Sequence, residues 1–284
     1  MMTSRVCGEI GSSGFLRLAI IQQEEHVKST TVAIFDANKE GILAGPENKS
    51  ARVIHSILMA DPDIQTIIVT GKKVRQSRLE GVDVFVIPGG GVIMYQQWVL
   101  GLRGRKIIRD FVRQGGGYFG ICSGAFLATN ARFGWLALID VKLHDMKHQN
   151  RGGGLINVKL HTDHAKAIFS PQCMQSDTLP MLYWQGPLML VPPHGQPTEA
   201  KRKQGFGIVK EVASFTSVIA PEDSDNERIR FPEYFSDEHM SGQTACISTT
   251  YGKGRVFVSS PHLELTKENQ GMIPEIIRWT ALGL

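Results

Sequence analysis

A cysteine framed by glycines is the residue of this sequence best placed for nucleophilic chemistry. Cys122 stands between Gly120 and Gly124 in the run GGGYFGICSGAF. Glycines two residues before and two residues after a nucleophile are typical of a sharp strand-to-helix turn, because side chains at those positions would collide. Such a turn presents the sulfur at the N-terminus of the next helix, where the partial positive charge favours a thiolate. A small buried apolar residue is the alternative reading.

A base for this sulfur lies far along the chain. His262 and Glu264 follow an apolar run and stand two residues apart, so on an extended segment they share one side. Acyl transfer by a thiolate needs a base that takes and returns a proton, and the base needs an acceptor that orients its ring. The pair therefore predicts a Cys-His-Glu triad, with an ordinary core or surface histidine as the alternative.

Three consecutive glycines supply the remaining chemistry. Gly89, Gly90 and Gly91 follow the buried run VDVFVIP. Glycines at the carboxyl end of a strand let backbone N–H groups approach a ligand closely, and ligands bind at that edge of open parallel sheets. We expect an oxyanion or substrate site there, and a flexible turn is the alternative.

The elements that must position these residues alternate between strand and helix in the first half of the chain. Apolar β-branched runs at 30–35, 66–70, 82–88 and 118–121 predict buried strands, with a basic loop after the second. Ser50 is predicted to cap a helix, and a further helical pattern covers residues 97–114. The pattern predicts an α/β fold of the flavodoxin-like type: a doubly wound, mostly parallel sheet with helices on both faces. Short apolar runs at 155–160, 181–184, 207–215, 217–220 and 245–250 predict antiparallel strands appended to its edge, and the turn YGKG joins the last of these to a strand at 255–259.

Length and composition are those of a globular protein. The 284 residues are 42% hydrophobic and 20% charged, with a formal net charge of +4 and no apolar run of membrane-spanning length. We expect a single domain at 29–284 after an N-terminal extension at 1–28. Four scattered cysteines and a weak N-terminal apolar patch predict a cytoplasmic protein without disulfides.

Basic and histidine clusters give weaker signals. Arginines and a lysine at 103–113 predict a solvated helix face, and we expect neither nucleic-acid nor membrane partners. Several histidines and aspartates are close in sequence but match no standard spacing for metal ligands, so we predict no metal site. These histidines and aspartates are His144, Asp145, His148, His161, Asp163 and His164.

Four motifs in order resemble a known superfamily. They are the PGGG loop, the elbow around Cys122, the YWQGP segment that contains Trp184 and Gln185, and the run YGKGRVFVSSPHLE. The chain resembles the class I glutamine amidotransferase-like superfamily, most closely its biotin-protein ligase N-terminal domain-like branch. The resemblance implies a Cys122, His262 and Glu264 triad, an oxyanion hole from the Gly90 and Gly91 backbone with the N–H of Ser123, and a pocket lined by the YWQGP segment.

Two departures bear on the substrate. Glutamine-hydrolysing members resemble one another in a glutamine four residues after the nucleophile, where this chain has Phe126, and Leu263 replaces the proline of their His-Pro-Glu. The sequence has no biotin-ligase catalytic segment and no Walker-type loop, so we expect no cofactor. The leading hypothesis is a cysteine-dependent amidase or amidotransferase-like hydrolase acting on a small amide through a thioester, with a possible separate acceptor protein. A catalytically silent binding or regulatory module and a redox sensor are the alternatives.

Overall fold

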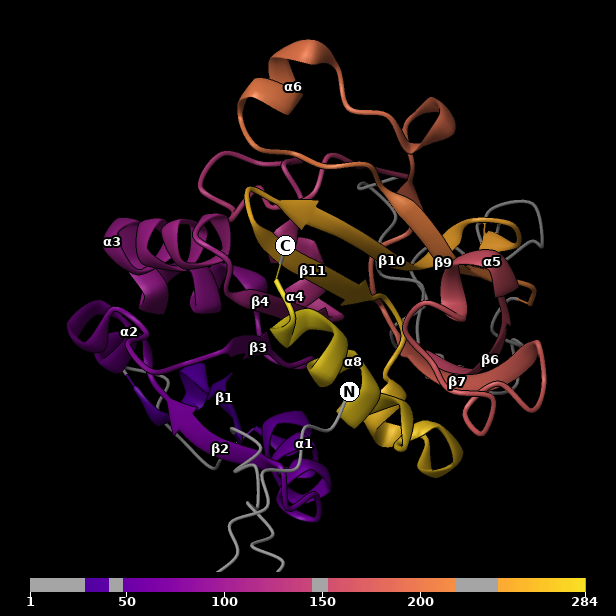
Figure 1. The fold of residues 1–284 in the computed structure, drawn as a ribbon, viewed down its shortest axis with the longest axis horizontal. Helices are drawn as coiled ribbons and strands as arrows, with labels where there is room; N and C mark the ends of the chain where they lie inside the picture. Colours follow the sequence, from indigo (N-terminus) through magenta and orange to yellow (C-terminus); the bar gives the residue numbers. More distant parts are fainter. Residues whose placement is uncertain (1–28, 41–47, 145–152, 218–239, 284) are drawn as a thin grey trace, which may run out of the picture.

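A computed structural model of the chain describes residues 29–40, 48–144, 153–217 and 240–283. Its strands form one mixed sheet in the order β2-β1-β3-β4-β11-β10-β9-β6-β7 (Figure 1). The predicted N-terminal extension and part of the predicted strand at 217–220 lie outside the described residues. The α/β fold with a flavodoxin-like parallel sheet is confirmed.

Half of the sheet is parallel. Strand β1 pairs with β2 and β3, and β4 pairs with β3 and β11, all in the same direction. Strands β1, β3, β4 and β11 are mostly buried on both faces, which explains their continuous apolar sequences, whereas the edge strand β2 has exposed residues. Their bounds are β2 (Ile64–Val69), β1 (Thr30–Phe35), β3 (Val84–Ile87), β4 (Gly117–Ile121) and β11 (Gly254–Ser259).

The other half is antiparallel, as the short apolar runs predicted. Strand β10 pairs antiparallel with β11, and β9, β6 and β7 follow in that order toward the edge of the sheet. A short pair formed by β5 and β8 joins the sheet beside β10. The bounds are β10 (Thr244–Tyr251), β9 (Lys210–Phe215), β6 (Gly153–Leu160), β7 (Thr178–Trp184), β5 (Lys142–Leu143) and β8 (Met189–Leu190).

Helices cover both faces of the parallel half. Alternate residues of β1 show the division: Val32 and Ile34 pack in the core beneath α1 and α8, whereas Ala33 and Phe35 pack in the core beneath α2, α3 and α4. The helices are α1 (Lys49–Met59), α2 (Gly71–Ser77), α3 (Ile93–Arg113), α4 (Ser123–Ala128) and α8 (Met272–Ala281), with α5 (Thr162–Ala165) and α6 (Glu199–Lys203) beside the antiparallel half (Figure 1).

Two local predictions were wrong. The basic segment after β2 is the helix α2 rather than a loop, because the hydroxyl of Thr70 accepts from the N–H of Lys73 and caps it. Helix α1 is capped by Asn48, which accepts from the N–H of Ala51 at 3.2 Å, and not by Ser50. Ser50 is thereby left for other contacts.

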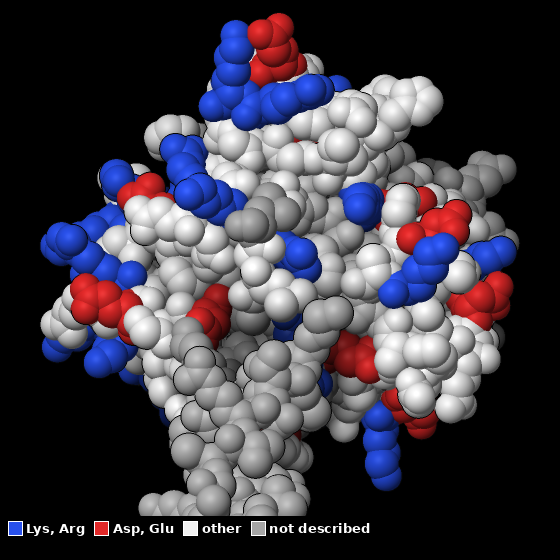
Figure 2. Space-filling model, viewed as in Figure 1, with Lys and Arg blue, Asp and Glu red and all other residues white. Residues whose placement is uncertain are grey.

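The basic side of α3 is solvated only in part, because Arg103, Lys106 and Arg113 are exposed whereas Arg105 and Arg109 make internal contacts. Arg105 is buried and donates to the carbonyl oxygen of Gly134, and Arg109 donates to the carbonyl oxygens of Leu136 and Ala137. These guanidinium groups fasten the chain that follows α4 to the helix. On the face drawn in Figure 2, acidic side chains lie among the basic ones instead of leaving one continuous positive field.

Candidate active site

The cysteine lies at a strained turn. Strand β4 ends at Ile121 and α4 begins at Ser123, and the backbone of Cys122 between them has φ 50° and ψ −101°. This is a left-handed conformation that a side-chain-bearing residue seldom adopts without compensation. A Cβ on Gly120 would lie 2.7 Å from the carbonyl oxygen of Gly124, and one on Gly124 would lie 2.1 Å from that of Ile87. The glycine frame is therefore a steric requirement.

Sheet order brings the histidine to this turn. Strands β4 and β11 are parallel neighbours that end together, with Ile121 opposite Ser259, so the residues after each strand emerge at one edge. The N–H of Cys122 donates to the carbonyl oxygen of Ser259 at 2.8 Å, and that of His262 donates to Leu182 at 2.7 Å. Residues separated by 140 positions thus become neighbours.

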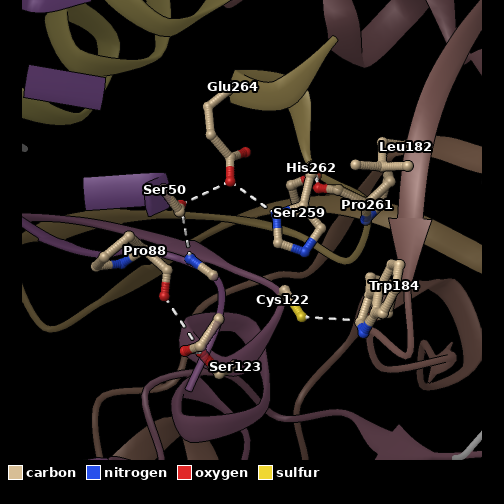
Figure 3. Close-up of polar contacts among 12 residues, drawn as sticks. Ser50, Pro88, Cys122, Ser123, Leu182, Trp184, Ser259, Pro261, His262 and Glu264 are labelled. Carbon is tan, nitrogen blue, oxygen red and sulfur yellow. Dashed lines mark hydrogen bonds and ion pairs between the residues drawn. The ribbon is translucent and has the colours of Figure 1, made fainter. Parts of the chain in front are cut away.

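The histidine and the glutamate form a buried pair. Nδ1 of His262 lies 2.7 Å from Oε1 of Glu264, with the side chains 5% and 0% exposed. Since a carboxylate only accepts, this contact places a proton on Nδ1 and leaves Nε2 for the sulfur. Figure 3 shows the ring lying between the carboxylate of Glu264 and the sulfur of Cys122.

Charge dominates the protonation of the ring. Burial lowers the pKa of His262, but the negative charge of Glu264 and the contact with Cys122 raise it, and the resulting pKa lies well above the usual value. An imidazolium beside the sulfur is the partner that a thiolate requires. The sulfur has a second neighbour, because Sγ of Cys122 lies 3.4 Å from the carbonyl oxygen of Trp184.

The glycine loop closes the other side of the site. A Cβ on Gly89 would lie 2.2 Å from Cε1 of His262, so the ring packs directly against the backbone. Gly90 and Gly91 have φ values of 83° and 79° and line the same cavity as Cys122. Among the described residues, no acceptor is found for the N–H groups of Gly90, Gly91 and Ser123. These N–H groups can therefore serve a developing oxyanion.

Side chains around the loop hold it in place. Oγ of Ser123 donates to the carbonyl oxygens of Pro88 and Gly90 at 3.2 and 3.1 Å. Nε2 of Gln96 donates to the carbonyl oxygen of Gly90 at 2.8 Å, and Nδ2 of Asn48 donates to that of Gly89 at 3.0 Å. Sequence reasoning missed Asn48, Ser50 and Gln96. Polar residues near helix starts carry no local signal of their partners, which for Asn48 and Ser50 lie 41 and 39 residues away.

A cavity of about 640 Å³ opens over the sulfur. Phe126 forms part of its wall and packs edge-on against Trp135, with the ring centroids 6.1 Å apart. Trp184 and Gln185 of the YWQGP segment also line this cavity. The lining residues are Asn38, Asn48, Lys49, Ser50, Gly89, Gly90, Gly91, Val92, Ile93, Cys122, Ser123, Phe126, Leu182, Trp184, Gln185, His262 and Leu265.

The other two cysteines that the structure describes have raised pKa values. Burial raises the pKa of Cys246 to about 12. Burial and the neighbouring Glu275 raise the pKa of Cys173. Cys7 lies outside the described residues.

The histidines near residue 160 have protein partners. Nε2 of His161 lies 3.0 Å from Oε1 of Glu211, and Nδ1 of His164 lies 2.8 Å from the Glu211 carbonyl oxygen. Within the described part of the chain, no three His, Cys, Asp or Glu residues gather as metal ligands do. Asp145 and His148 lie outside that part. No described helix combines the length and apolarity needed to span a bilayer.

Comparison with known proteins supports the resemblance. Residues 57–135 match the family model for the N-terminal region of biotin-protein ligase, and this segment contains the glycine loop and Cys122 but ends before His262. The predicted resemblance is confirmed. Over these residues the chain is similar to the N-terminal region of biotin-protein ligase. No curated protein matches it significantly.

Solved structures share the fold at low identity. PurLQS from Thermotoga maritima superposes with a TM-score of 0.52 and 11% identity, over 88% of this chain and 99% of that one. A protein described as ThuA-like from Bacteroides uniformis superposes with a TM-score of 0.51 and 10% identity, over 89% and 91% of the two chains. At such identities, the likeness concerns the fold alone.

Proposed function

We propose that the protein is a cysteine-dependent hydrolase of small amide-type substrates that acts through a thioester on Cys122. The observation that carries the proposal is the buried 2.7 Å contact between His262 and Glu264 at the strand edge where the elbow of Cys122 emerges. The amidotransferase-like fold supports the general class.

The first half of the reaction forms the thioester. His262 takes the proton of Cys122, and the sulfur attacks the amide carbonyl carbon, whose oxygen becomes an oxyanion facing the N–H groups of Gly90, Gly91 and Ser123. The C–N bond then breaks, and the leaving nitrogen takes the proton from Nε2 of His262. Glu264 keeps the ring oriented throughout these steps.

The second half releases the acid. His262 removes a proton from water, the resulting hydroxide attacks the thioester carbonyl carbon, and the C–S bond breaks. The leaving sulfur takes the proton back from Nε2 of His262, and the carboxylic acid leaves. Transfer of the released nitrogen to a separate acceptor protein stays a prediction that extends this scheme.

The cavity wall argues against glutamine as the substrate. Phe126, which replaces the glutamine of glutamine-hydrolysing members, is 3% exposed and presents an aromatic ring to the cavity. A substrate whose acyl part is apolar fits this wall better than one with a polar α-amino acid head, because unpaired polar groups lose their hydration on burial.

A metabolite screen tests the proposal. The wild-type protein and Cys122→Ala are incubated with a panel of small primary and secondary amides, and the products are followed by mass spectrometry. We expect hydrolysis of at least one amide by the wild type, with a mass increase on Cys122 during turnover, and none by Cys122→Ala. Equal consumption by both proteins would refute the assignment of the nucleophile.

A binding module is the second candidate, and one contact favours it. The carbonyl oxygen of Trp184, 3.4 Å from the sulfur, accepts from a neutral thiol and repels a thiolate. A module of this kind would be stabilised by a metabolite that is recovered unchanged, and Cys122→Ala would be stabilised equally. Thermal-shift measurements followed by mass spectrometry of the ligand therefore separate the two candidates.

A further inference from the structure

The peptide of Gly89 is held from both sides by the first turn of α1. Nδ2 of Asn48 donates to the carbonyl oxygen of Gly89 at 3.0 Å, and the N–H of Gly89 donates to Oγ of Ser50 at 3.1 Å. Both side chains are buried, and both come from a helix start 39 residues or more before the loop. The loop that faces the substrate is therefore fixed by α1 as well as by its own strand.

The same serine also reaches the triad. Oγ of Ser50 donates to Oε1 of Glu264 at 2.6 Å, the oxygen that also receives Nδ1 of His262 (Figure 3). One hydroxyl thus joins a backbone N–H of the glycine loop to the carboxylate that orients the base. The chain of contacts runs from Gly89 through Ser50 and Glu264 to His262.

A purely local role for this serine does not account for these contacts. Asn48 already caps α1, and the backbone of Glu264 is held separately, since Nε2 of Gln270 donates to its carbonyl oxygen at 2.8 Å. The carboxylate is fully buried, and its second oxygen, Oε2, has no hydrogen-bond partner in the described structure. Oε1 therefore carries the hydrogen bonds that compensate this burial, and Ser50 supplies one of them.

We propose that Ser50 is a positioning residue that couples the catalytic triad to the oxyanion loop, by orienting the Glu264 carboxylate toward His262 and fixing the Gly89 peptide with the same hydroxyl. The inference rests on the proposed function, because it assigns a role within that site. Ser50 does not touch the reacting atoms, so it acts through Glu264 and through Gly89.

Removing the hydroxyl weakens both contacts together. In Ser50→Ala the carboxylate keeps a single hydrogen bond in a dry environment, and the proton shared with the ring moves toward the carboxylate. His262 then carries less positive charge, and Cys122 becomes a poorer nucleophile. Loss of one hydrogen bond to a buried charged group corresponds to about a tenfold decrease in the rate of Cys122 alkylation.

Peptide-resolved alkylation with iodoacetamide at pH 7 tests this role. The variants are Ser50→Ala, Ser50→Thr, which keeps a hydroxyl, and Ser56→Ala, a matched control on the exposed face of the same helix. We expect Ser50→Ala to react about tenfold more slowly at Cys122, and Ser50→Thr and Ser56→Ala to stay within about twofold of the wild type. If Ser50→Ala does not fold, Ser50→Cys retains the volume, weakens only the donor and is expected to slow Cys122 similarly.

The possible outcomes separate the role of Ser50 from the proposed function of the site. An unchanged rate at Cys122 in Ser50→Ala, or an equal loss in Ser50→Thr, would overturn the coupling role while leaving the triad intact. A wild-type Cys122 that reacts no faster than Cys173 would instead overturn the proposed function itself. The pH dependence of Cys122 alkylation gives a second readout. The rise of the alkylation rate moves to higher pH in Ser50→Ala only if the His262 ring has lost positive charge.

Discussion

At the residue scale, the site depends on glycines, because a side chain at these positions would collide with its neighbours. The ring of His262 occupies the space where Gly89 would otherwise carry a Cβ, and Cys122 has a backbone conformation that few non-glycine residues adopt. Such crowding holds the imidazole, the sulfur and the loop in one arrangement without relying on flexible contacts. Each glycine of the site is therefore as specific a requirement as a charged group.

Gly89→Ala tests this crowding. The added methyl group would meet the His262 ring at 2.2 Å, so the ring must move away from Glu264 and Cys122. We expect a loss of about 1–3 kcal/mol in the free energy of unfolding, as overpacking typically costs, with at least a tenfold slower alkylation of Cys122. Urea unfolding and peptide mass spectrometry measure the two effects.

Gly104→Ala is the matched control. This glycine lies inside α3, and a Cβ there meets its nearest neighbour at an ordinary 3.6 Å. Alanine is the better helix former, so we expect this variant to be stabilised by about 0.5–1 kcal/mol with unchanged Cys122 reactivity. A Gly89→Ala protein that behaved in the same way would show that the loop does not constrain the ring.

The protonation of His262 gives a second test at this scale. Its raised pKa means that the imidazolium persists above pH 6.5, the usual value, and is lost only as the pH rises through the higher folded-state pKa. In Glu264→Gln the raising charge is removed while burial, which lowers the pKa, remains, so the midpoint must fall. NMR of ring-labelled histidine measures both midpoints. Equal midpoints in the two proteins would refute the charge pairing.

At the element scale, the parallel order of β3, β4 and β11 gathers the site. Their carboxyl ends deliver the glycine loop, Cys122 and His262 to one edge, although β11 follows β4 only after more than 130 residues of chain. Beyond Cys122, the described part of this intervening chain supplies no side chain to the candidate triad. Its last strands, β9 and β10, extend the sheet beyond β11, and the end of β7 covers the sulfur through Trp184.

This order explains which features could be predicted. The elbow, the glycine loop and the strand before His262 have local signals, namely fixed glycine spacing and apolar runs, and they were placed correctly. The role of Ser50 had none, because a serine at a helix start ordinarily caps it, and its partner Glu264 lies 214 residues away. The internal contacts of Arg105 and Arg109 had no local signal either, because their carbonyl acceptors lie on the segment that follows α4.

Packing between β4 and β11 provides the prediction at this scale. Phe119 and Phe257 are fully buried, and their rings meet edge-on with centroids 5.8 Å apart. Phe257→Leu removes this ring pair, so we expect a decrease of about 1–2 kcal/mol in the free energy of unfolding by urea. The exposed Ile67→Val on β2 should change it by no more than about 0.5 kcal/mol. Equal effects would contradict the view that this strand pair lies at the centre of the core.

At the scale of the whole molecule, the fold is shared widely while the chemistry depends on a few positions. PurLQS and the ThuA-like protein superpose on most of this chain at 11% and 10% identity, so the architecture tolerates almost complete replacement of its side chains. The polar residues of the site are therefore what distinguishes an enzyme from a binding module on this scaffold. Two further features bear on the function of this chain: Phe126 makes the cavity wall apolar, and the carbonyl oxygen of Trp184 contacts the sulfur of Cys122.

The central claim is that His262 activates Cys122. The most direct measurement is the rate of iodoacetamide alkylation at each cysteine at pH 7, in the wild type and in His262→Ala. We predict that Cys122 reacts at least about tenfold faster than Cys173 in the wild type, and that His262→Ala abolishes this advantage while the rate at Cys173 is unchanged. A Cys122 that reacts as slowly as Cys173, or equally fast with and without His262, would contradict the account.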